Sequence, residues 1–116
     1  MKIPIFIISE KFTKTFSIFI DIYAITLFPF IISKEQLNEE VKNHESIHIH
    51  QQKELFLIFF YLLYVLFFTI NYFKFRDTKL AYLKIPFEVE AYKNQEDLEY
   101  LKNRKFYSWI KYINND

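Results

Sequence analysis

An uninterrupted run of uncharged residues, 55–73, constrains the fold more than any other feature of the sequence. As one helix this run would be about 28 Å long, close to the thickness of the hydrocarbon core of a bilayer. A chain of 116 residues has too few neighbouring elements to cover such a helix on all sides. The run therefore predicts a membrane-associated protein with lipid as a partner, for example in a bacterial inner membrane. Basic residues flank the run on both sides, so its orientation is not predicted.

The composition of the whole chain excludes several classes of protein. Its length suits a single domain, residues 1–116, with one modest core. The net charge of +1 gives no reason to expect nucleic acid as a partner. Without cysteine there is neither a disulfide framework nor a thiolate metal site. Without glycine there is no Gly-rich phosphate loop, and turns made by Asn, Asp, Ser or Pro favour long helices over tight hairpins.

The first 33 residues carry the pattern of short strands. Three runs rich in β-branched and aromatic residues are separated by polar breaks: Ile3–Ile8, Phe16–Ile20 and Ala24–Ile32. Pro29 lies inside the third run, which predicts an edge strand or a bulge, because proline cannot donate a ladder hydrogen bond. An edge strand there could hold an extended peptide. A core strand with one tolerated proline is the equal alternative.

The rest of the chain has a helical pattern. Ser33-Lys34-Glu35-Gln36 matches a capping box and predicts a helix from there to about Glu54. Residues 74–116 are polar and helical in pattern, with Pro86 placed for the first turn of a helix. The apolar stripe predicted for that last helix consists of Phe87, Ala91, Leu98 and Leu101. The predicted fold class is therefore α+β: a small N-terminal β-sheet, a polar helix, the hydrophobic segment and a C-terminal helix.

The chemistry is concentrated at His44-Glu45-Ser46-Ile47-His48, an H-E-x-x-H pattern on the polar helix. Residues four apart lie about 40° from each other around a helix, so both imidazoles leave the same face and can share one Zn²⁺. Glu45 lies beside the metal position, where it can accept a proton from the attacking water and deliver it to the leaving amine. The chain has three histidines, all within residues 44–50. His50 projects about 240° from His44, so a structural or solvent-facing role is expected for it.

A zinc site needs a third ligand from elsewhere in the chain, and Glu88 and Glu90 are the candidates. They point about 200° apart on a helix, so only one can face the site, and helical geometry does not choose between them. Gln51 falls about 20° from His44 around the polar helix, so it can line the site or orient a ligand, although a solvated glutamine is an equal alternative.

His44-Glu45-x-x-His48 followed downstream by Glu88-Val89-Glu90-Ala91 resembles the gluzincins, zinc peptidases whose third ligand is a glutamate on a later helix. The similarity is greatest to the membrane-embedded zinc endopeptidases and the small minigluzincins, and it covers these two motifs and the order of elements. It implies a Zn²⁺ cofactor held by His44, His48 and Glu88. It also implies hydrolysis of a peptide or protein substrate with Glu45 as catalytic base. Tyr92 stands where the family usually has an aspartate that supports a histidine, and its hydroxyl could make a similar hydrogen bond.

A straight membrane-spanning helix conflicts with this ligand set. Phe73 would lie about 37 Å from His48, and the charged stretch leading to Glu88 would have to return through hydrocarbon almost fully extended. We therefore expect the run 55–73 to bend into two shorter helices, or to dip into one leaflet, with the active site at the membrane interface.

Two other interpretations of the sequence remain open. The first is a catalytically inactive, zinc-binding membrane scaffold, although zinc binding alone does not require Glu45. The second is a small helical membrane protein in which H-E-x-x-H is accidental; it predicts no convergence of Glu88 or Glu90 on the histidines. The sequence predicts neither the oligomeric state nor the cleavage specificity.

Overall fold

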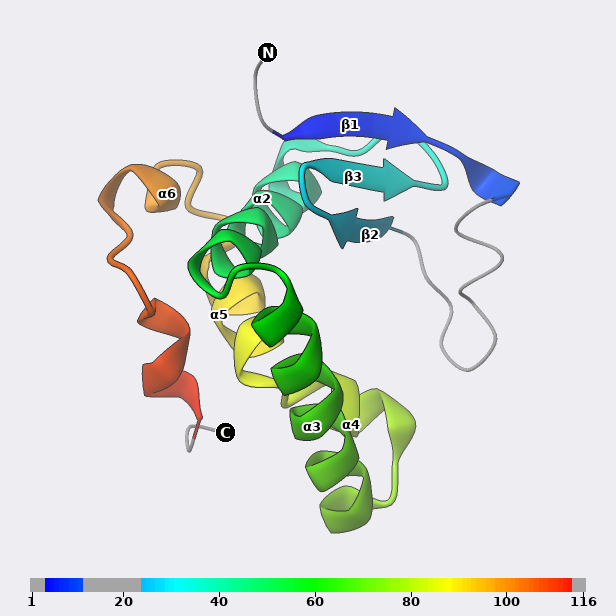
Figure 1. Cartoon of the computed structure of the whole chain (residues 1–116). Coiled ribbons are helices and arrows are strands. Elements are labelled where there is room, and N and C mark those ends of the chain that lie inside the picture. The colour runs from blue at the N-terminus through cyan, green and yellow to red at the C-terminus, as the bar shows by residue number, and fades with distance from the viewer. Residues whose placement is uncertain (1–3, 12–23, 114–116) are drawn as a thin grey trace.

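The computed structural model describes residues 4–11 and 24–113 and confirms the predicted α+β class (Figure 1). A three-stranded sheet near the N-terminus is followed by helices. The predicted strand Phe16–Ile20 lies outside the described residues. The elements are β1 Ile5–Ile8, β2 Ala24–Leu27, β3 Phe30–Ser33, α2 Glu39–Glu54, α3 Ile58–Phe75, α4 Thr78–Leu83, α5 Pro86–Asn94, α6 Tyr100–Asn103 and the 3₁₀ helix η1 Ser108–Tyr112.

The run predicted as one strand, Ala24–Ile32, forms a tight hairpin instead. The strand order is β1-β3-β2, with β3 parallel to β1 and antiparallel to β2. The chain reverses at Phe28 and Pro29, so that Ile25 pairs with Ile32. The prediction of a proline inside an edge strand is therefore wrong, because Pro29 lies in the turn, where no ladder hydrogen bond is needed. β2 nevertheless occupies an edge of the described sheet.

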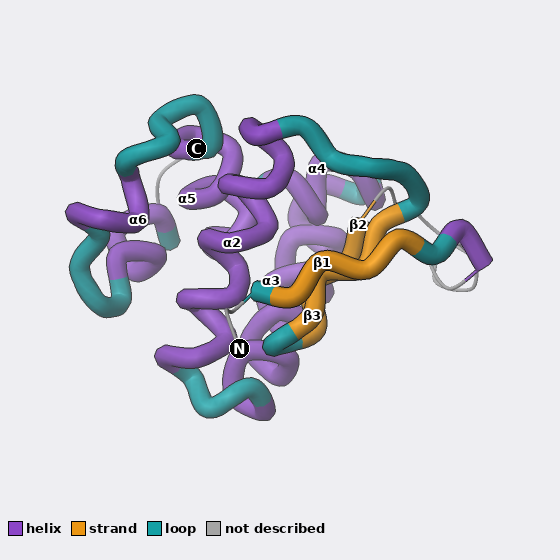
Figure 2. The backbone as a smooth tube through the Cα atoms, turned by 90° about the horizontal axis from the view of Figure 1, so that it is seen from above, coloured by secondary structure: helices purple, strands orange, loops and turns teal. Residues whose placement is uncertain are grey.

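Helix α2 packs against the sheet on one side and against α5 on the other (Figure 2). Its start differs from the capping-box prediction. Ser33 ends β3, and its hydroxyl donates to the Glu35 carbonyl at 2.6 Å. The N-cap is Asn38, whose side chain accepts from the Val41 amide at 2.8 Å. The polar loop after β3 therefore delays the helix until Glu39, while its end at Glu54 is as predicted.

The chain reverses direction between α2 and α3. Phe56 and Leu57 adopt left-handed φ values of 53° and 65°, and the Leu57 amide donates to the Gln52 carbonyl at 2.8 Å. The hydrophobic run then forms the single helix α3, so the prediction that it bends into two shorter helices is wrong, and the chain turns before this helix begins. Arg76, also left-handed, ends α3, and α4 returns along it. This return brings the chain to α5, which begins at Pro86 as predicted, without an extended crossing.

An aromatic core joins α3, α5 and η1. Phe87 is fully buried, with its ring centroid 4.6 Å from that of Phe60 and 4.7 Å from that of Trp109. Ile85 completes this cluster. The predicted stripe does not continue as far as Leu98, because α5 ends at Asn94 and Leu98 is 56% exposed. Phe87 therefore anchors the beginning of the helix that carries Glu88 and Glu90.

Candidate metal centre

Two adjacent helices bring His44, His48 and Glu88 together. The histidines lie on α2 and the glutamate on α5, which packs beside α2 (yellow in Figure 1). Glu88 Oε1 lies 3.1 Å from His44 Nε2 and 3.0 Å from His48 Nε2. The three side chains are buried, and the possible ligand atoms all lie within 4.8 Å of one another. The helices thus select Glu88, and not Glu90, as the carboxylate facing the histidines.

Two of the three separations between ligand atoms are close to those of a tetrahedral metal site. Two ligand atoms bonded to a tetrahedral ion at 2.0–2.1 Å are about 3.4 Å apart. The observed distances of 3.0 and 3.1 Å between nitrogen and carboxylate oxygen are a few tenths of an ångström shorter. Small side-chain adjustments therefore open the group to accept an ion, and the donor set is two nitrogens and one oxygen.

The far nitrogen of each imidazole is held by a glutamine. His48 Nδ1 lies 2.7 Å from Gln51 Oε1, and His44 Nδ1 lies 2.7 Å from Gln95 Oε1. An amide oxygen can only accept, so each Nδ1 donates its proton to a glutamine. Each Nε2 faces Glu88, and its lone pair is directed to the metal position once that nitrogen has lost its proton. Gln51 is fully buried, so the solvated alternative for this residue is wrong. Gln95 was not predicted.

Tyr92 does not make the hydrogen bond to a histidine that was expected of it. Its ring packs edge-on against the His44 ring at a centroid distance of 4.4 Å, while its hydroxyl bonds to the Tyr82 hydroxyl at 2.9 Å. His44 instead donates this hydrogen bond to Gln95, which lies just beyond α5.

Glu88 is also held on its second oxygen. The Tyr64 hydroxyl of α3 donates to Glu88 Oε2 at 2.6 Å, which leaves Oε1 directed at the histidines. The uncharged run 55–73 thus contributes a polar side chain to the site, and no spacing rule in the sequence indicates this contact. The nearest signal is the tyrosine content of an otherwise apolar run.

Glu45 is buried beside the sheet. The Thr26 hydroxyl of β2 donates to Glu45 Oε2 at 2.5 Å. Within the described part of the chain no hydrogen bond reaches Oε1, so one oxygen is restrained and the other can act on a water or a substrate. The sequence predicts Glu45 but not Thr26, because the run that contains Thr26 has the pattern of one long strand and not of the hairpin that brings β2 over α2.

The next glutamine, Gln52, bonds the outer edge of β2. Its side chain accepts from the Phe28 amide at 2.8 Å and donates to the Thr26 carbonyl at 2.7 Å. A neighbouring strand would make the same pair of hydrogen bonds. This part of the edge is therefore already paired, and an extended peptide placed along β2 can bond only toward Ala24.

The charges in the metal-free site are strongly coupled. Burial alone lowers the pKa of His48, but attraction and hydrogen bonding to Glu88 outweigh it and raise that pKa to about 9. For Glu88, burial raises the pKa, but the charge of His48 and the hydrogen bonds from His44 and His48 bring it well below its usual range. At neutral pH the metal-free site therefore holds an imidazolium–carboxylate pair, and metal binding must displace a proton.

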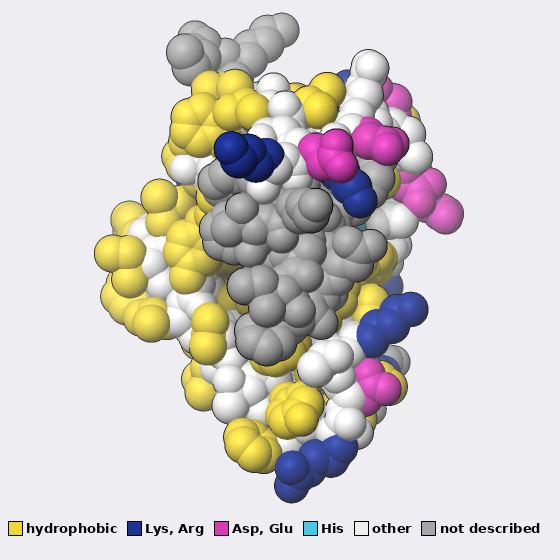
Figure 3. Space-filling model, turned by 90° about the vertical axis from the view of Figure 1, so that its right-hand side faces the viewer, with side chains coloured by type: hydrophobic (Ala, Val, Ile, Leu, Met, Phe, Trp, Pro, Cys, Tyr) yellow, Lys and Arg dark blue, Asp and Glu magenta, His cyan; other side chains and the backbone are white. Residues whose placement is uncertain are grey.

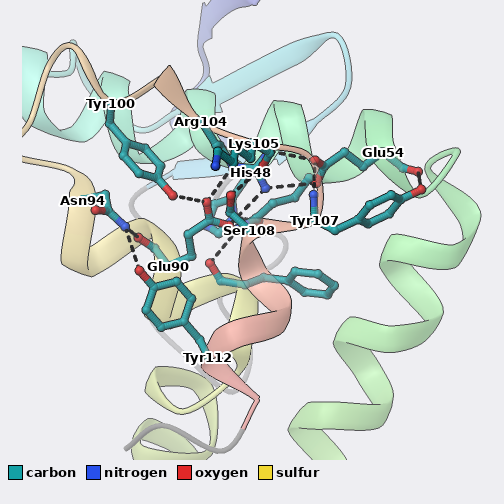
Figure 4. A network of polar contacts seen from close by, with 12 residues as sticks. His48, Glu54, Glu90, Asn94, Tyr100, Arg104, Lys105, Tyr107, Ser108 and Tyr112 are labelled. Atoms are coloured by element: carbon teal, nitrogen blue, oxygen red, sulfur yellow. Dashed lines mark hydrogen bonds and ion pairs between the residues drawn. The ribbon is translucent and has the colours of Figure 1, made fainter. Parts of the chain in front are cut away.

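Glu90 and His50 lie apart from this group. Glu90 points to the other side of α5, where it bonds to Arg104, Tyr100 and Gln51 (Figure 4). His50 is exposed, as predicted. The accidental reading of H-E-x-x-H predicted that neither Glu88 nor Glu90 would converge on the histidines, and the geometry is the opposite for Glu88.

Comparisons with protein-family models, curated proteins and solved structures find no match.

Proposed function

We propose that this protein is a zinc-dependent peptidase in which His44, His48 and Glu88 hold Zn²⁺ and Glu45 is the catalytic base. The observation that carries the proposal is the meeting of both Nε2 atoms of an H-E-x-x-H helix with Glu88 Oε1 from a separate helix. Glu45 lies next to the first of these histidines in sequence and is restrained by Thr26. The resemblance to gluzincins agrees with this assignment of roles.

The donor set favours zinc over the harder and softer ions. Two imidazoles and one carboxylate, without thiolates, form a ligand set of catalytic zinc sites, which leaves a fourth position open. A zinc ion bound there supplies Lewis acidity, lowering the pKa of water to about 7 and polarising a carbonyl. Gln51 and Gln95 keep the imidazoles in the tautomer that binds the ion, and Tyr64 fixes the orientation of Glu88.

Glu45 would move the protons of the reaction. Its Oε2 is held by Thr26, so its Oε1 can accept a proton from the attacking water and then deliver it to the leaving amine. A scaffold that only binds zinc has no use for a restrained carboxylate at this position. The geometry around Glu45 therefore favours hydrolysis over the inactive alternative.

An assay of Glu45→Gln tests the hydrolytic role separately from metal binding. The zinc-loaded wild-type protein is expected to cleave a quenched fluorescent peptide library, and the variant should lose at least about 10²-fold in rate while keeping its zinc. Equal cleavage by both proteins, or none by a wild type that holds zinc, would contradict the peptidase function.

We also propose that the enzyme works at a membrane surface through α3. Of the described helices, α3 alone is long and apolar enough to cross a membrane, and Phe60 is its only buried residue. Eight of its exposed side chains fall within about 140° of the helical wheel, and the exposed Tyr61, Tyr72 and Lys74 flank this sector. This face, which we call the α3 face, consists of Ile58, Phe59, Leu62, Val65, Leu66, Thr69, Ile70 and Phe73.

The α3 face offers lipid no unpaired polar group. Its single hydroxyl, on Thr69, donates to the Val65 carbonyl at 2.8 Å. Figure 3 shows hydrophobic side chains gathered along one side of the molecule. Such a surface suits the boundary between headgroups and acyl chains, with the basic residues Lys74, Arg76 and Lys79 near anionic headgroups.

A position in the plane of the membrane suits α3 better than a spanning one. Its opposite side packs on the aromatic core and on α4, to which Asn71 of α3 donates a hydrogen bond at the Ala81 carbonyl (3.1 Å). If α3 spanned the bilayer, α4 would return along it and bring its charged end at Lys84 into hydrocarbon. Docking through one face avoids that cost and keeps Glu88 above the lipid.

Depth measurements distinguish the two positions. Because the chain has no cysteine, spin labels at Ile58→Cys, Leu66→Cys and Phe73→Cys report local depth in anionic vesicles. In-plane docking predicts similar, shallow depths at all three positions, with Lys102→Cys in water as the control. A label at Leu66→Cys much deeper than the other two indicates spanning, and failure to bind vesicles refutes the membrane location.

A further inference from the structure

A buried ion cluster connects the C-terminal segment to the two helices of the metal centre (Figure 4). Arg104 bonds Glu54 of α2 through Nη1 and Nη2 at 2.9 and 3.0 Å. It bonds Glu90 of α5 through Nε and Nη2 at 2.6 and 3.1 Å. The three side chains are exposed by only 3%, 1% and 0%, in the order Arg104, Glu54, Glu90. Two carboxylates are thus held in the interior by one guanidinium.

Neighbouring groups complete the hydrogen bonding of both carboxylates. The Tyr100 hydroxyl donates to Glu90 Oε2 at 2.5 Å, and the Tyr107 amide donates to Glu54 Oε2 at 2.6 Å. All three donor residues come from the segment 100–107, which lies beyond α5. This segment therefore does more than cover the core, because it fixes the position of one buried carboxylate on each helix.

Only one of the two carboxylates is connected to a metal ligand. Gln51 Nε2 donates to Glu90 Oε1 at 2.9 Å and to the Phe87 carbonyl at 3.0 Å. With its nitrogen committed to two acceptors, the Gln51 amide must present its oxygen to His48 Nδ1, at 2.7 Å. If the Gln51 amide were flipped, its NH₂ would face the Nδ1–H of His48. Its oxygen would then face the Glu90 carboxylate and the Phe87 carbonyl, which are both acceptors. Glu54 accepts only from the C-terminal segment among the described residues.

A second, weaker arrangement of the same kind serves the other histidine. Gln95 accepts from His44 Nδ1 and donates to Glu40 Oε1 at 2.6 Å. Glu40 lies half-buried in the first turn of α2, and no described arginine binds it. Each histidine thus donates a hydrogen bond to a glutamine, which in turn donates one to a glutamate. Only the arrangement that begins at His48 is fully buried and ends on an arginine.

We propose that Arg104 is a positioning residue of the metal centre, acting on His48 through Glu90 and Gln51, so that the C-terminal segment is part of the site. The inference rests on the proposed function in its use of His48 as a ligand. It predicts that disturbing Glu90 weakens metal binding, although Glu90 itself touches no ligand position. Loss of a partner that orients a ligating histidine typically costs about 10–100-fold in metal affinity.

The chain supplies a matched pair of variants for the test. Glu54→Gln and Glu90→Gln make the same isosteric change in the two buried partners of Arg104, but only Glu90 is linked to His48. Zinc affinity is measured by competition with a chromophoric chelator. The visible absorption of bound Co²⁺ reports ligand geometry, and the unfolding temperature reports structural damage. Gln51→Met cuts the same link and serves if Glu90→Gln does not fold.

We expect both variants to lower the unfolding temperature, and only Glu90→Gln to weaken zinc binding, by about 10–100-fold, and to shift the Co²⁺ spectrum. Equal zinc affinities and spectra for wild type, Glu54→Gln and Glu90→Gln would overturn the positioning role, as would equal weakening by both. If the wild-type protein binds neither Zn²⁺ nor Co²⁺, the result refutes the metal centre itself and not only the positioning role of Arg104.

Discussion

Replacement of Arg104 by methionine tests how the buried ion cluster contributes to stability. Methionine retains most of the side-chain volume but removes four hydrogen bonds to two buried carboxylates. Breaking a buried ion pair by removing one partner costs about 3–5 kcal/mol, since an uncompensated charge remains in the interior. Single domains have a free energy of unfolding of about 5–15 kcal/mol, so Arg104→Met should remove a large part of it.

The same reasoning predicts a partial rescue. When Glu54→Gln and Glu90→Gln are added to Arg104→Met, no buried charge is left without a partner, and at least about half of the lost stability should return. Thermal unfolding followed by circular dichroism, in one detergent for all variants, measures both effects. At about 3–6 °C per kcal/mol for a chain of this size, Arg104→Met should unfold about 10–25 °C below the wild type.

Two results would refute this reasoning. A loss below about 1 kcal/mol in Arg104→Met would be typical of an exposed ion pair and would contradict the burial of the cluster. A triple variant less stable than Arg104→Met alone would mean that uncompensated charge is not the cause of the loss.

Two further predictions concern pH and helix capping. The metal-free protein should unfold at a lower temperature near pH 9 than near pH 6. Folding raises the pKa of His48 from 6.5 to about 9, so the contribution of its charge to stability is lost as pH rises through that value. A higher unfolding temperature near pH 9 than near pH 6 would contradict this prediction. Because Asn38 caps α2, Asn38→Ala should lower the free energy of unfolding by about 1 kcal/mol, and Ser33→Ala should lower it by less. Chemical denaturation measures both, and a larger loss in Ser33→Ala would favour a capping box at Ser33.

The motif on α2 could be predicted because its chemistry depends on helical spacing alone. His44 and His48 share a face in any helix, and the capping error at Ser33 did not alter their relation. Asn38-Glu39-Glu40 is the better start signal, with a capping side chain followed by acidic residues in the first turn. The choice of Glu88 over Glu90 required the packing of α5 on α2, which periodicity does not give.

The reversal at Phe56 and Leu57 could not be predicted from local preference. Neither residue favours a left-handed backbone, and no glycine or proline marks the break. Tertiary contacts on both sides support the reversal: Glu54 is held by Arg104, and Tyr64 bonds Glu88. Tertiary contacts also decide which polar residues support the site. Gln95 and Arg104 come from polar segments whose sequence predicts exposed side chains.

Zinc stoichiometry of purified variants tests whether His48 and Glu88 are metal ligands. Wild type and Glu90→Gln are dialysed against a low, buffered zinc concentration set well above the expected Kd of Glu90→Gln, and compared with His48→Ala and Glu88→Gln by elemental analysis. We expect about one zinc per chain in wild type and in Glu90→Gln, although Glu90→Gln binds it more weakly, and almost none in His48→Ala and Glu88→Gln. Absence of zinc from the wild type, or its retention by Glu88→Gln, would contradict the metal centre described above.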